Sequence, residues 1–269
     1  MQETWFVTGA SRGLGAQIAK AAIRAGNRVV ATSRRREALV ETLGPDSDQL
    51  SNLELDVTSA GEARAAVQAA LSRFGAIDVL VNNARYGYLG FFEESTIRDT
   101  QAQFPTNLFG VLNVTRAVLP IKRSARKGRI FNISSFGGIL GAELGPLHGA
   151  SKFALDGISE SLSREIAPFG LFVTVVESGP LRTEFLTRES LRDPAKLAES
   201  IVRMAGEAKP PTRTDRIEIE RSLAWHLDTP IGDHRLHYQR SDEGYQECQH
   251  RERSFRSSGL PLAWKRHGR

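Results

Sequence analysis

Three glycines near the start of the chain, Gly9, Gly13 and Gly15, have the spacing G-x-x-x-G-x-G. Apolar residues 5–7 precede them and predict a short buried strand, and an amphipathic helix is expected over residues 16–25. Glycines let the backbone approach a pyrophosphate, and the free N–H groups at the start of a helix face that anion. The order strand, glycine turn and helix therefore predicts a nucleotide site, whereas glycines alone would also fit a plain connection.

The elements that would position this site alternate along the chain up to about residue 207. Strands are expected at residues 5–7, 28–33, 53–57, 77–82, 129–134 and 171–177. Helices are expected at residues 16–25, 34–43, 60–74, 95–104, 108–125, 148–167 and 194–207. Pro105 predicts either a break between two helices or a first-turn proline. Repeated βα units predict an α/β fold, a doubly wound parallel sheet with helices on both faces.

The composition is that of a globular protein, with 269 residues of which 40% are hydrophobic and 25% charged. No apolar run reaches the roughly 18 residues of a membrane span, and no signal peptide precedes the first strand, so no membrane partner is expected. The single cysteine, Cys248, fits a reducing compartment, and we expect the protein in the cytoplasm. The net charge of +5 is compatible with a nucleic-acid partner, but a solvated surface with a site for a phosphorylated cofactor explains it better.

The sequence divides into a nucleotide-binding domain at residues 1–207 and a C-terminal segment at residues 208–269. Hydrophobic periodicity is lost after Pro211, and only one short helix, at residues 216–227, is indicated. This composition predicts an irregular or disordered basic extension. Its histidines and cysteine have a spacing that matches no zinc site, so no metal is expected. These residues are His226, His234, His237, Cys248 and His250.

Seven short motifs occur in the order of a known family, at residues 8–15, 56–57, 82–84, 107, 132–135, 151–152 and 179–180. Residues 4–207 therefore resemble the short-chain dehydrogenase/reductases of the classical type. The resemblance implies a Rossmann-like fold and the transfer of a hydride between a nicotinamide cofactor and a small-molecule alcohol or carbonyl substrate. Family members often form dimers or tetramers through the helices expected at 108–125 and 148–167, so the resemblance also allows a homo-oligomer.

The resemblance also implies which residues contact the cofactor. Asp56 would contact the adenine, and Asn83 and Ala84 would line the adenosine side. The nicotinamide side would be lined by Gly179, Pro180 and Thr183. The complete set of implied cofactor-binding residues is Gly9, Ser11, Arg12, Gly13, Leu14, Gly15, Ser33, Arg34, Asp56, Val57, Asn83, Ala84, Lys152, Gly179, Pro180 and Thr183.

The residues after the second strand indicate which nicotinamide cofactor is used. An acidic residue there would bind the ribose 2′-hydroxyl and repel a 2′-phosphate. Here Ser33 is followed by Arg34, Arg35 and Arg36, and Arg12 lies in the neighbouring glycine turn. Guanidinium groups bind phosphate through paired hydrogen bonds, so NADP(H) is predicted over NAD(H). The plain alternative is that the three arginines are a solvated helix start.

The resemblance implies four catalytic residues, Asn107, Ser135, His148 and Lys152, and one of them departs from the family. The family pair is Tyr-x-x-x-Lys, whose spacing puts both side chains on one helix face. Here histidine stands at the tyrosine position, with Lys152 four residues later and Ser135 thirteen residues earlier, as in the family. In the family the tyrosine protonates the developing alkoxide, the serine orients the carbonyl, and the asparagine holds a relay water.

A histidine at this position changes the expected chemistry. Imidazole serves as a general acid or base, but its tip reaches about 2 Å less far than a phenol, and catalysis is sensitive to a misplacement of about 1 Å. The Lys152 ammonium and an oxidised nicotinamide both disfavour imidazolium, so His148 is predicted to be neutral at pH 7. Neutral imidazole accepts a proton more readily than it gives one, which favours alcohol oxidation or slow turnover.

Three further departures surround the predicted site. Arg85 stands where the family has glycine, Ser178 stands where proline is usual, and the connection at 182–193 is shorter than the family's substrate lid. Two functions therefore stay open. The first is an NADP(H)-dependent oxidoreductase with impaired or altered activity. The second is a catalytically silent nucleotide-binding protein that acts as a sensor or binds a partner.

Overall fold

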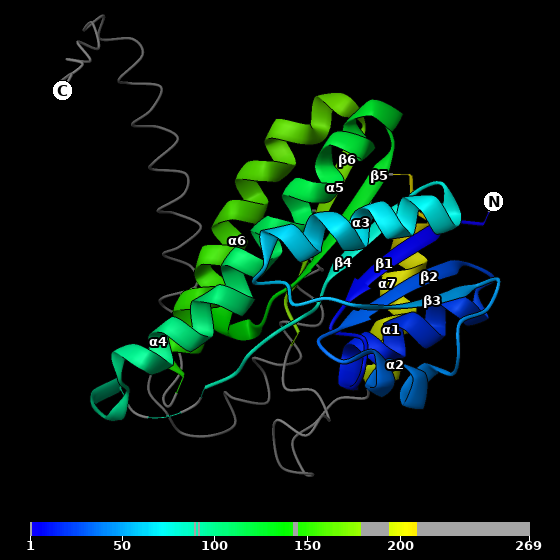
Figure 1. The fold of residues 1–269 in the computed structure, drawn as a ribbon. Helices are drawn as coiled ribbons and strands as arrows, with labels where there is room; N and C mark the ends of the chain where they lie inside the picture. Colours follow the sequence, from blue (N-terminus) through cyan, green and yellow to red (C-terminus); the bar gives the residue numbers. More distant parts are fainter. Residues whose placement is uncertain (1, 89, 91, 142–144, 179–193, 209–269) are drawn as a thin grey trace, which may run out of the picture. The chain divides into compact units, whose positions relative to one another are not determined.

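The computed structural model describes residues 2–88, 90, 92–141, 145–178 and 194–208 (Figure 1). Within this part, six parallel strands form one sheet in the order β3-β2-β1-β4-β5-β6. The strands are β1 (Thr4–Thr8), β2 (Arg28–Ser33), β3 (Leu50–Glu54), β4 (Val79–Asn82), β5 (Gly128–Ile133) and β6 (Leu171–Val176). The predicted doubly wound parallel sheet is confirmed. Apart from residue 208, the predicted C-terminal extension lies outside the described residues.

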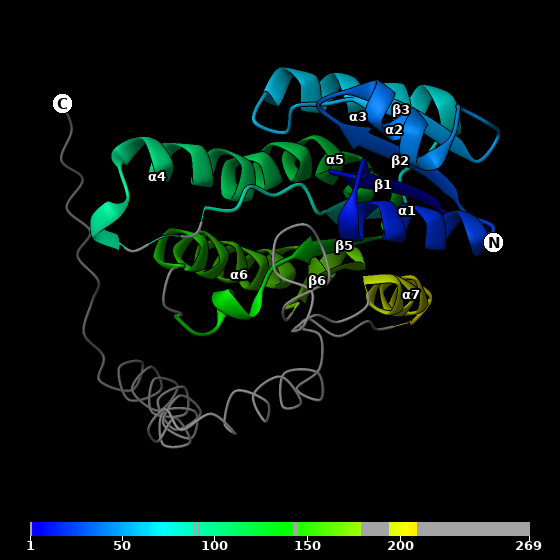
Figure 2. The same ribbon diagram turned by 90° about the horizontal axis from the view of Figure 1, so that it is seen from below.

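Helices connect the strands and cover both faces of the sheet (Figure 2). They are α1 (Gly13–Arg24), α2 (Arg36–Leu43), α3 (Ala60–Phe74), α4 (Ile97–Phe104), α5 (Val111–Ala125), α6 (Pro146–Ile166) and α7 (Pro194–Ala205). The ends of α3 show how local sequence sets where a helix begins and ends. At its start, the Ser59 side chain accepts a hydrogen bond from the backbone N–H of Glu62 and so caps the helix. At its other end Gly75 adopts a left-handed conformation, which ends the helix.

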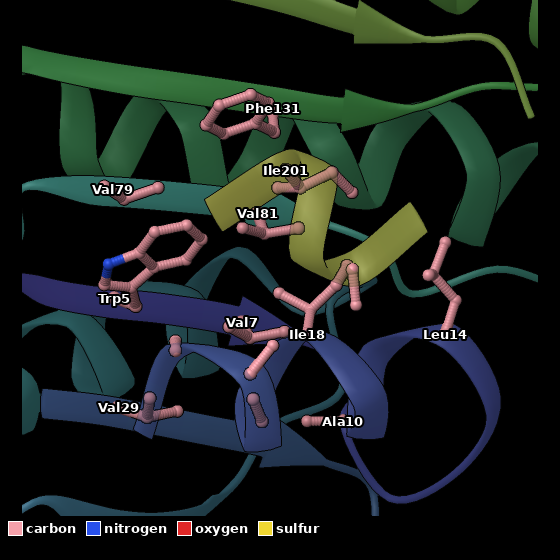
Figure 3. Close-up of a cluster of buried hydrophobic side chains, with 14 of the residues drawn as sticks. Trp5, Val7, Ala10, Leu14, Ile18, Val29, Val79, Val81, Phe131 and Ile201 are labelled. Atoms are coloured by element: carbon pink, nitrogen blue, oxygen red, sulfur yellow. The ribbon is translucent and has the colours of Figure 1, made fainter. Parts of the chain in front are cut away.

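Alternate residues of each strand point to opposite faces, which gives the sheet two hydrophobic cores. On one face, Trp5 and Val7 of β1 pack with residues of α1, α2 and α7. On the other face, Phe6 packs with residues of α3, α5 and α6. Figure 3 shows the first core, in which Trp5 stacks on Phe131 with ring centroids 6.4 Å apart. Because both faces are covered, the strands are apolar over consecutive positions, as in other buried parallel sheets.

One strand lies earlier than the sequence predicts. β3 occupies Leu50–Glu54 rather than residues 53–57. Its last residue pairs with Ser33, where β2 ends, so no partner strand remains for the residues that follow. Asp56 instead begins the turn into α3, where one carboxylate oxygen accepts hydrogen bonds from the backbone N–H and the hydroxyl of Thr58 at 2.9 and 2.8 Å.

The chain stays helical through Pro105. This residue begins a π-helical segment, Pro105–Gly110, that joins α4 to α5. Of the two alternatives predicted for this proline, the break is therefore wrong and the first-turn position is confirmed. Such π-helical segments occur frequently at functional sites. Asn107, one of the predicted catalytic residues, lies within this segment.

The topology brings the predicted cofactor residues to one edge of the sheet. β1 lies between β2 and β4, so the order of strand addition reverses there. In open α/β sheets, ligands bind outside the carboxyl ends of the strands at this reversal. Gly9, Arg34 and Asn83 each follow the carboxyl end of one of these three strands, which places the glycine turn next to the other two segments.

We expect Gly15→Ala to lower the free energy of unfolding by about 1–3 kcal/mol, the usual cost of overpacking. A β-carbon at residue 15 would collide with the Gly9 carbonyl oxygen and with Nδ2 of Asn83. Gly157→Ala is the matched control, because an added carbon there meets no heavy atom within 4 Å outside the backbone of its own helix. That change should stabilise α6 by about 0.5–1 kcal/mol. Urea unfolding measures both, and equal effects would contradict the close packing of the turn.

Candidate active site

The glycine turn is fastened to the end of β4 by hydrogen bonds. Gly9 and Gly13 have φ angles of 65° and 57°, which non-glycine residues rarely adopt. The Thr8 hydroxyl accepts hydrogen bonds from the backbone N–H groups of Asn83 and Ala84 at 2.9 and 3.0 Å. Nδ2 of Asn83 donates to the carbonyl oxygens of Thr8 and Gly9 at 2.9 and 3.0 Å. Asn83 and Ala84 therefore hold the shape of the predicted phosphate-binding turn.

The first turn of α1 is suited to an anion. Arg12 precedes it in an extended conformation, and its side chain does not cap the helix. The first N–H groups of a helix need a partner, and the helix dipole adds partial positive charge there. Leu14 is buried in the core and anchors this end, while the Thr42 hydroxyl donates to the Ser11 carbonyl at 2.7 Å and ties α2 to the turn. The residues present therefore fit a cofactor pyrophosphate.

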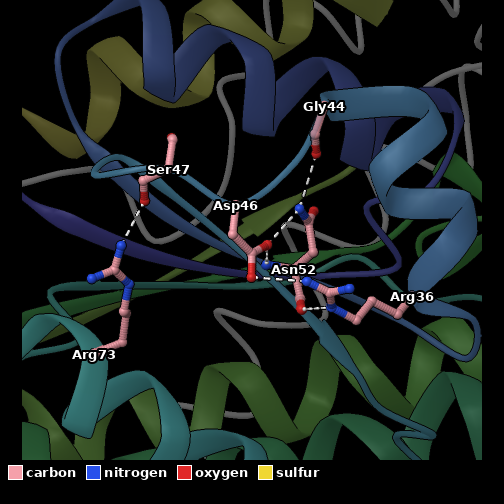
Figure 4. Close-up of polar contacts among 6 residues, drawn as sticks. All are labelled: Arg36, Gly44, Asp46, Ser47, Asn52 and Arg73. Carbon is pink, nitrogen blue, oxygen red and sulfur yellow. Dashed lines mark hydrogen bonds and ion pairs between the residues drawn. The ribbon is translucent and has the colours of Figure 1, made fainter.

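Arg34 and Arg36, which follow β2, have different surroundings. Arg36 donates to the Asn52 carbonyl at 3.0 Å and pairs with the Asp46 carboxylate at 2.9 Å (Figure 4). Burial opposes the charge of Asp46, but hydrogen bonds from Asn52 and the Arg36 guanidinium outweigh it and lower the pKa of that carboxyl. Arg34 is exposed and makes no ion pair within the described part of the chain. Of the two, Arg34 is therefore available to a phosphate group, and Arg36 is occupied.

The adenine side is joined to the π-helical segment. Asp56 is half-buried, and Val57 beside it is buried against Gly110. A β-carbon at residue 110 would lie 2.6 Å from Cγ2 of Val57, so only glycine permits this contact. The close approach sets the distance between the Asp56 turn and the helix that carries Asn107.

Asn107 connects the segment after β4 to α6. Its Oδ1 accepts from the Tyr86 backbone N–H at 2.8 Å, and its Nδ2 donates to the Tyr86 carbonyl at 2.9 Å. The same Nδ2 donates to the Ser151 hydroxyl at 3.1 Å, and that hydroxyl donates to the His148 carbonyl at 2.8 Å. Both polar ends of the Asn107 side chain are therefore occupied by protein groups. Its role in holding a relay water stays a prediction.

Ser135, His148 and Lys152 lie around one end of α6. Gly137 lies between the first two, because a β-carbon on it would be 3.7 Å from both Ser135 Oγ and His148 Cδ2. Lys152 follows His148 by one helical turn and is 3% exposed, and its Nζ donates to the Ile133 carbonyl at 2.7 Å. The structure therefore brings the four predicted catalytic residues, including Asn107, to one region. Gly179, Pro180 and Thr183 lie outside the described residues, as does the whole segment 182–193.

Gln103 is a site residue that the sequence analysis missed. It is fully buried in α4, and its Nε2 donates to the Tyr86 carbonyl at 2.9 Å. The same nitrogen lies 3.4 Å from Nδ1 of His148. The signal that would have found it is the i, i+4 spacing from Asn107, which places both amides on one helix face.

Residues 3–193 match the model of a known protein family, described as short chain dehydrogenase. The chain belongs to the short-chain dehydrogenase family. Oxidoreductase BOA17 of Botryotinia fuckeliana is 36% identical over 241 residues, which cover 79% of this chain and 88% of that protein. The crystal structure of a short-chain dehydrogenase from Streptomyces avermitilis has 34% identity and a TM-score of 0.77, and the match covers 91% of this chain and 97% of that one.

A third relative, an actinorhodin polyketide ketoreductase solved with NADPH, has 29% identity and a TM-score of 0.73 over 79% of this chain and 94% of its own. Relatives at this level are oxidoreductases and reductases, so this short-chain dehydrogenase is an oxidoreductase. The resemblance inferred from the motifs is confirmed. None of the described helices has the length and apolar content needed to cross a membrane.

Positive charge is concentrated in the site of this short-chain dehydrogenase. Burial, then the charges of Lys152 and Arg85, lower the pKa of His148 to about 4. Burial and the Arg85 charge lower the pKa of Lys152 to about 7, against the opposing effect of Asp156. Burial and the nearby Arg12 also lower the pKa of Arg85. His148 is therefore neutral at pH 7, in agreement with the expectation from sequence.

Replacing Arg85 with glutamine should raise the pKa of His148 from about 4, because the change removes a like charge beside the ring. Solvent screening limits the expected rise to less than about one unit. NMR titration of the ring protons measures it, with the His148→Asn variant identifying the signal. Arg98→Gln removes an exposed charge from α4 and should leave the titration unchanged. A His148 pKa that does not move in Arg85→Gln would contradict the position of this charge.

Proposed function

We propose that this short-chain dehydrogenase transfers a hydride between NADP(H) and an alcohol or carbonyl group, with activity altered by the histidine at position 148. The observation that carries the proposal is the convergence of Ser135, His148 and Lys152 around one end of α6. The glycine turn, fastened to β4 through Asn83, provides a cofactor site at the same edge of the sheet. Substrate and cofactor would then meet at the carboxyl ends of the central strands.

NADP(H) is proposed over NAD(H) because of the charges near the end of β2. Arg34 is exposed and without an ion pair among the described residues, and Arg12 lies in the adjacent turn. The three residues that follow Ser33 are all arginines, so no carboxylate is placed directly after β2 to bind a ribose 2′-hydroxyl. Three solved relatives contain NADP or NADPH, which supports the same choice for this chain.

Each residue of the site has a distinct proposed role. When bound, the nicotinamide supplies or accepts the hydride. The Ser135 hydroxyl borders the space next to His148 and orients the substrate oxygen. Lys152 is held by the Ile133 carbonyl and places positive charge one turn from His148, which favours an oxyanion in that space. Asn107 fixes the backbone of Tyr86 and so holds the segment that follows β4.

A second candidate is a catalytically silent protein that binds the nucleotide. The observation that favours it is the histidine at position 148: burial and the charges of Lys152 and Arg85 lower its pKa to about 4, so at pH 7 it carries no acidic proton. The expected tyrosine would supply a proton in that position. Both candidates predict cofactor binding, but only the oxidoreductase predicts turnover of a substrate. Substrate assays on variants therefore distinguish them.

We expect NADPH to bind about tenfold or more tightly than NADH, because charge-assisted hydrogen bonds form to the 2′-phosphate. Arg34→Ala should remove most of this preference. Arg36→Ala is the matched control, since Arg36 is engaged by Asp46 and Asn52. Its loss should cost up to about 1 kcal/mol of stability and leave the preference unchanged. Fluorescence titration with both cofactors gives the answer, and equal affinities in the unaltered protein would refute the proposed cofactor.

Restoring the phenol through His148→Tyr should raise the rate of carbonyl reduction by about 100-fold, the lower end of what a positioned general acid contributes. The new hydroxyl would lie one turn from Lys152, whose charge lowers the pKa of a phenol. The gain should disappear in a Lys152→Ala background, because the pair acts as a unit. Steady-state assays over a broad set of carbonyls test this. Normal NADPH binding with no gain on any of them would make the silent nucleotide-binding protein the better conclusion.

A further inference from the structure

The orientation of the Gln103 amide is fixed by backbone groups. Its Oε1 accepts a hydrogen bond from the Tyr88 N–H at 3.0 Å, and its Nε2 donates to the Tyr86 carbonyl at 2.9 Å. A backbone N–H only donates and a carbonyl only accepts, so exchanging the two ends of the amide would break both bonds. The NH₂ end of this fully buried side chain therefore faces α6.

The second hydrogen of this NH₂ group faces two acceptors. Nδ1 of His148 lies 3.4 Å from Nε2 of Gln103, and the Ser151 hydroxyl oxygen lies at 3.5 Å. The hydrogen of Ser151 is already donated to the His148 carbonyl, so its oxygen presents lone pairs to Gln103. A hydrogen on Nδ1 would point at the amide N–H groups and would be repelled. In the neutral ring, Nδ1 is therefore the acceptor and Nε2 carries the hydrogen.

We infer that Gln103 is a positioning residue that holds His148 as the neutral Nε2–H tautomer, so that His148 meets the substrate as a hydrogen-bond donor and not as a base. The part of this inference that concerns substrate rests on the proposed function. An Nε2 that already carries hydrogen has no lone pair to accept a proton from an alcohol. The sequence predicts that His148 favours alcohol oxidation by accepting a proton. The Nε2–H tautomer would instead stabilise a carbonyl oxygen or alkoxide by donating a hydrogen bond.

Among the described residues, the charged groups that lower the pKa of His148 act in the same direction. Lys152 lies one turn along α6, and Arg85 lies in the segment after β4; both are positive and oppose imidazolium. Gln103, from α4, is neutral and offers only a donor to Nδ1. Protonation of Nδ1, the ring nitrogen that still has a lone pair, therefore meets like charge and also loses the hydrogen bond that Gln103 donates.

The test is ¹⁵N NMR of the histidine-labelled full-length protein, with the His148→Asn variant identifying the signals. At pH 7 we expect Nε2 of His148 to carry the hydrogen and Nδ1 to carry none. Gln103→Glu replaces the donor with a carboxylate, which should move hydrogen to Nδ1 and raise the His148 pKa by about 1–3 units. Gln101→Glu makes the same chemical change at an exposed position of α4 and should leave both unchanged.

Gln103→Met provides a second variant of similar size without a donor, for use if a buried carboxylate prevents folding. It should leave a mixture of the two tautomers at pH 7. Hydrogen on Nδ1 in the unaltered protein, or a His148 pKa that is equal in Gln103→Glu and Gln101→Glu, would overturn the inference. None of these readouts needs turnover. A protein with the expected tautomer and no activity would count against the proposed function alone, and an active protein with hydrogen on Nδ1 would count against the role of Gln103 alone.

Discussion

The site depends on how the segment after β4, residues 83–88, is held. This segment leaves the sheet where the strand order reverses, so its backbone polar groups have no strand to pair with and need other partners. On the cofactor side, the Thr8 hydroxyl accepts hydrogen bonds from the first two N–H groups of this segment. On the catalytic side the amides of Gln103 and Asn107 bind the backbone of Tyr86. Short hydrogen bonds to backbone atoms therefore set the spacing between the glycine turn and α6.

The fold was readable from sequence because each local signal agreed with the sheet. The strand at 28–33 and the helix at 60–74 have the predicted bounds, since an apolar run and a pair of caps mark their ends. The position of β3 shows what such local signals do not predict. Its end depends on where β2 runs out of partners, at Ser33, and not on the apolar residues Leu55 and Val57, which are buried after the strand has ended.

The chemistry of the site was only partly readable for the same reason. Three consecutive arginines are equivalent in sequence, and the contacts of Asp46 and Asn52, made after folding, separate Arg36 from Arg34. Gln103 belongs to a polar helix that a sequence pattern would expose to solvent. It becomes buried because the segment after β4 folds back over α4 and needs a donor and an acceptor there. The hydrogen-bond partners of Gln103 are not visible in the sequence, which offers only its i, i+4 spacing from Asn107 as a signal.

Positive charges near the proposed cofactor site also control the protonation of His148 and Lys152. Burial and Arg85 hold the pKa of Lys152 near about 7, so this predicted cofactor contact changes charge close to neutral pH. An anion beside Lys152 favours the ammonium, and by linkage the ammonium binds the anion more tightly. Affinity for such an anion should then fall as the pH rises through 7.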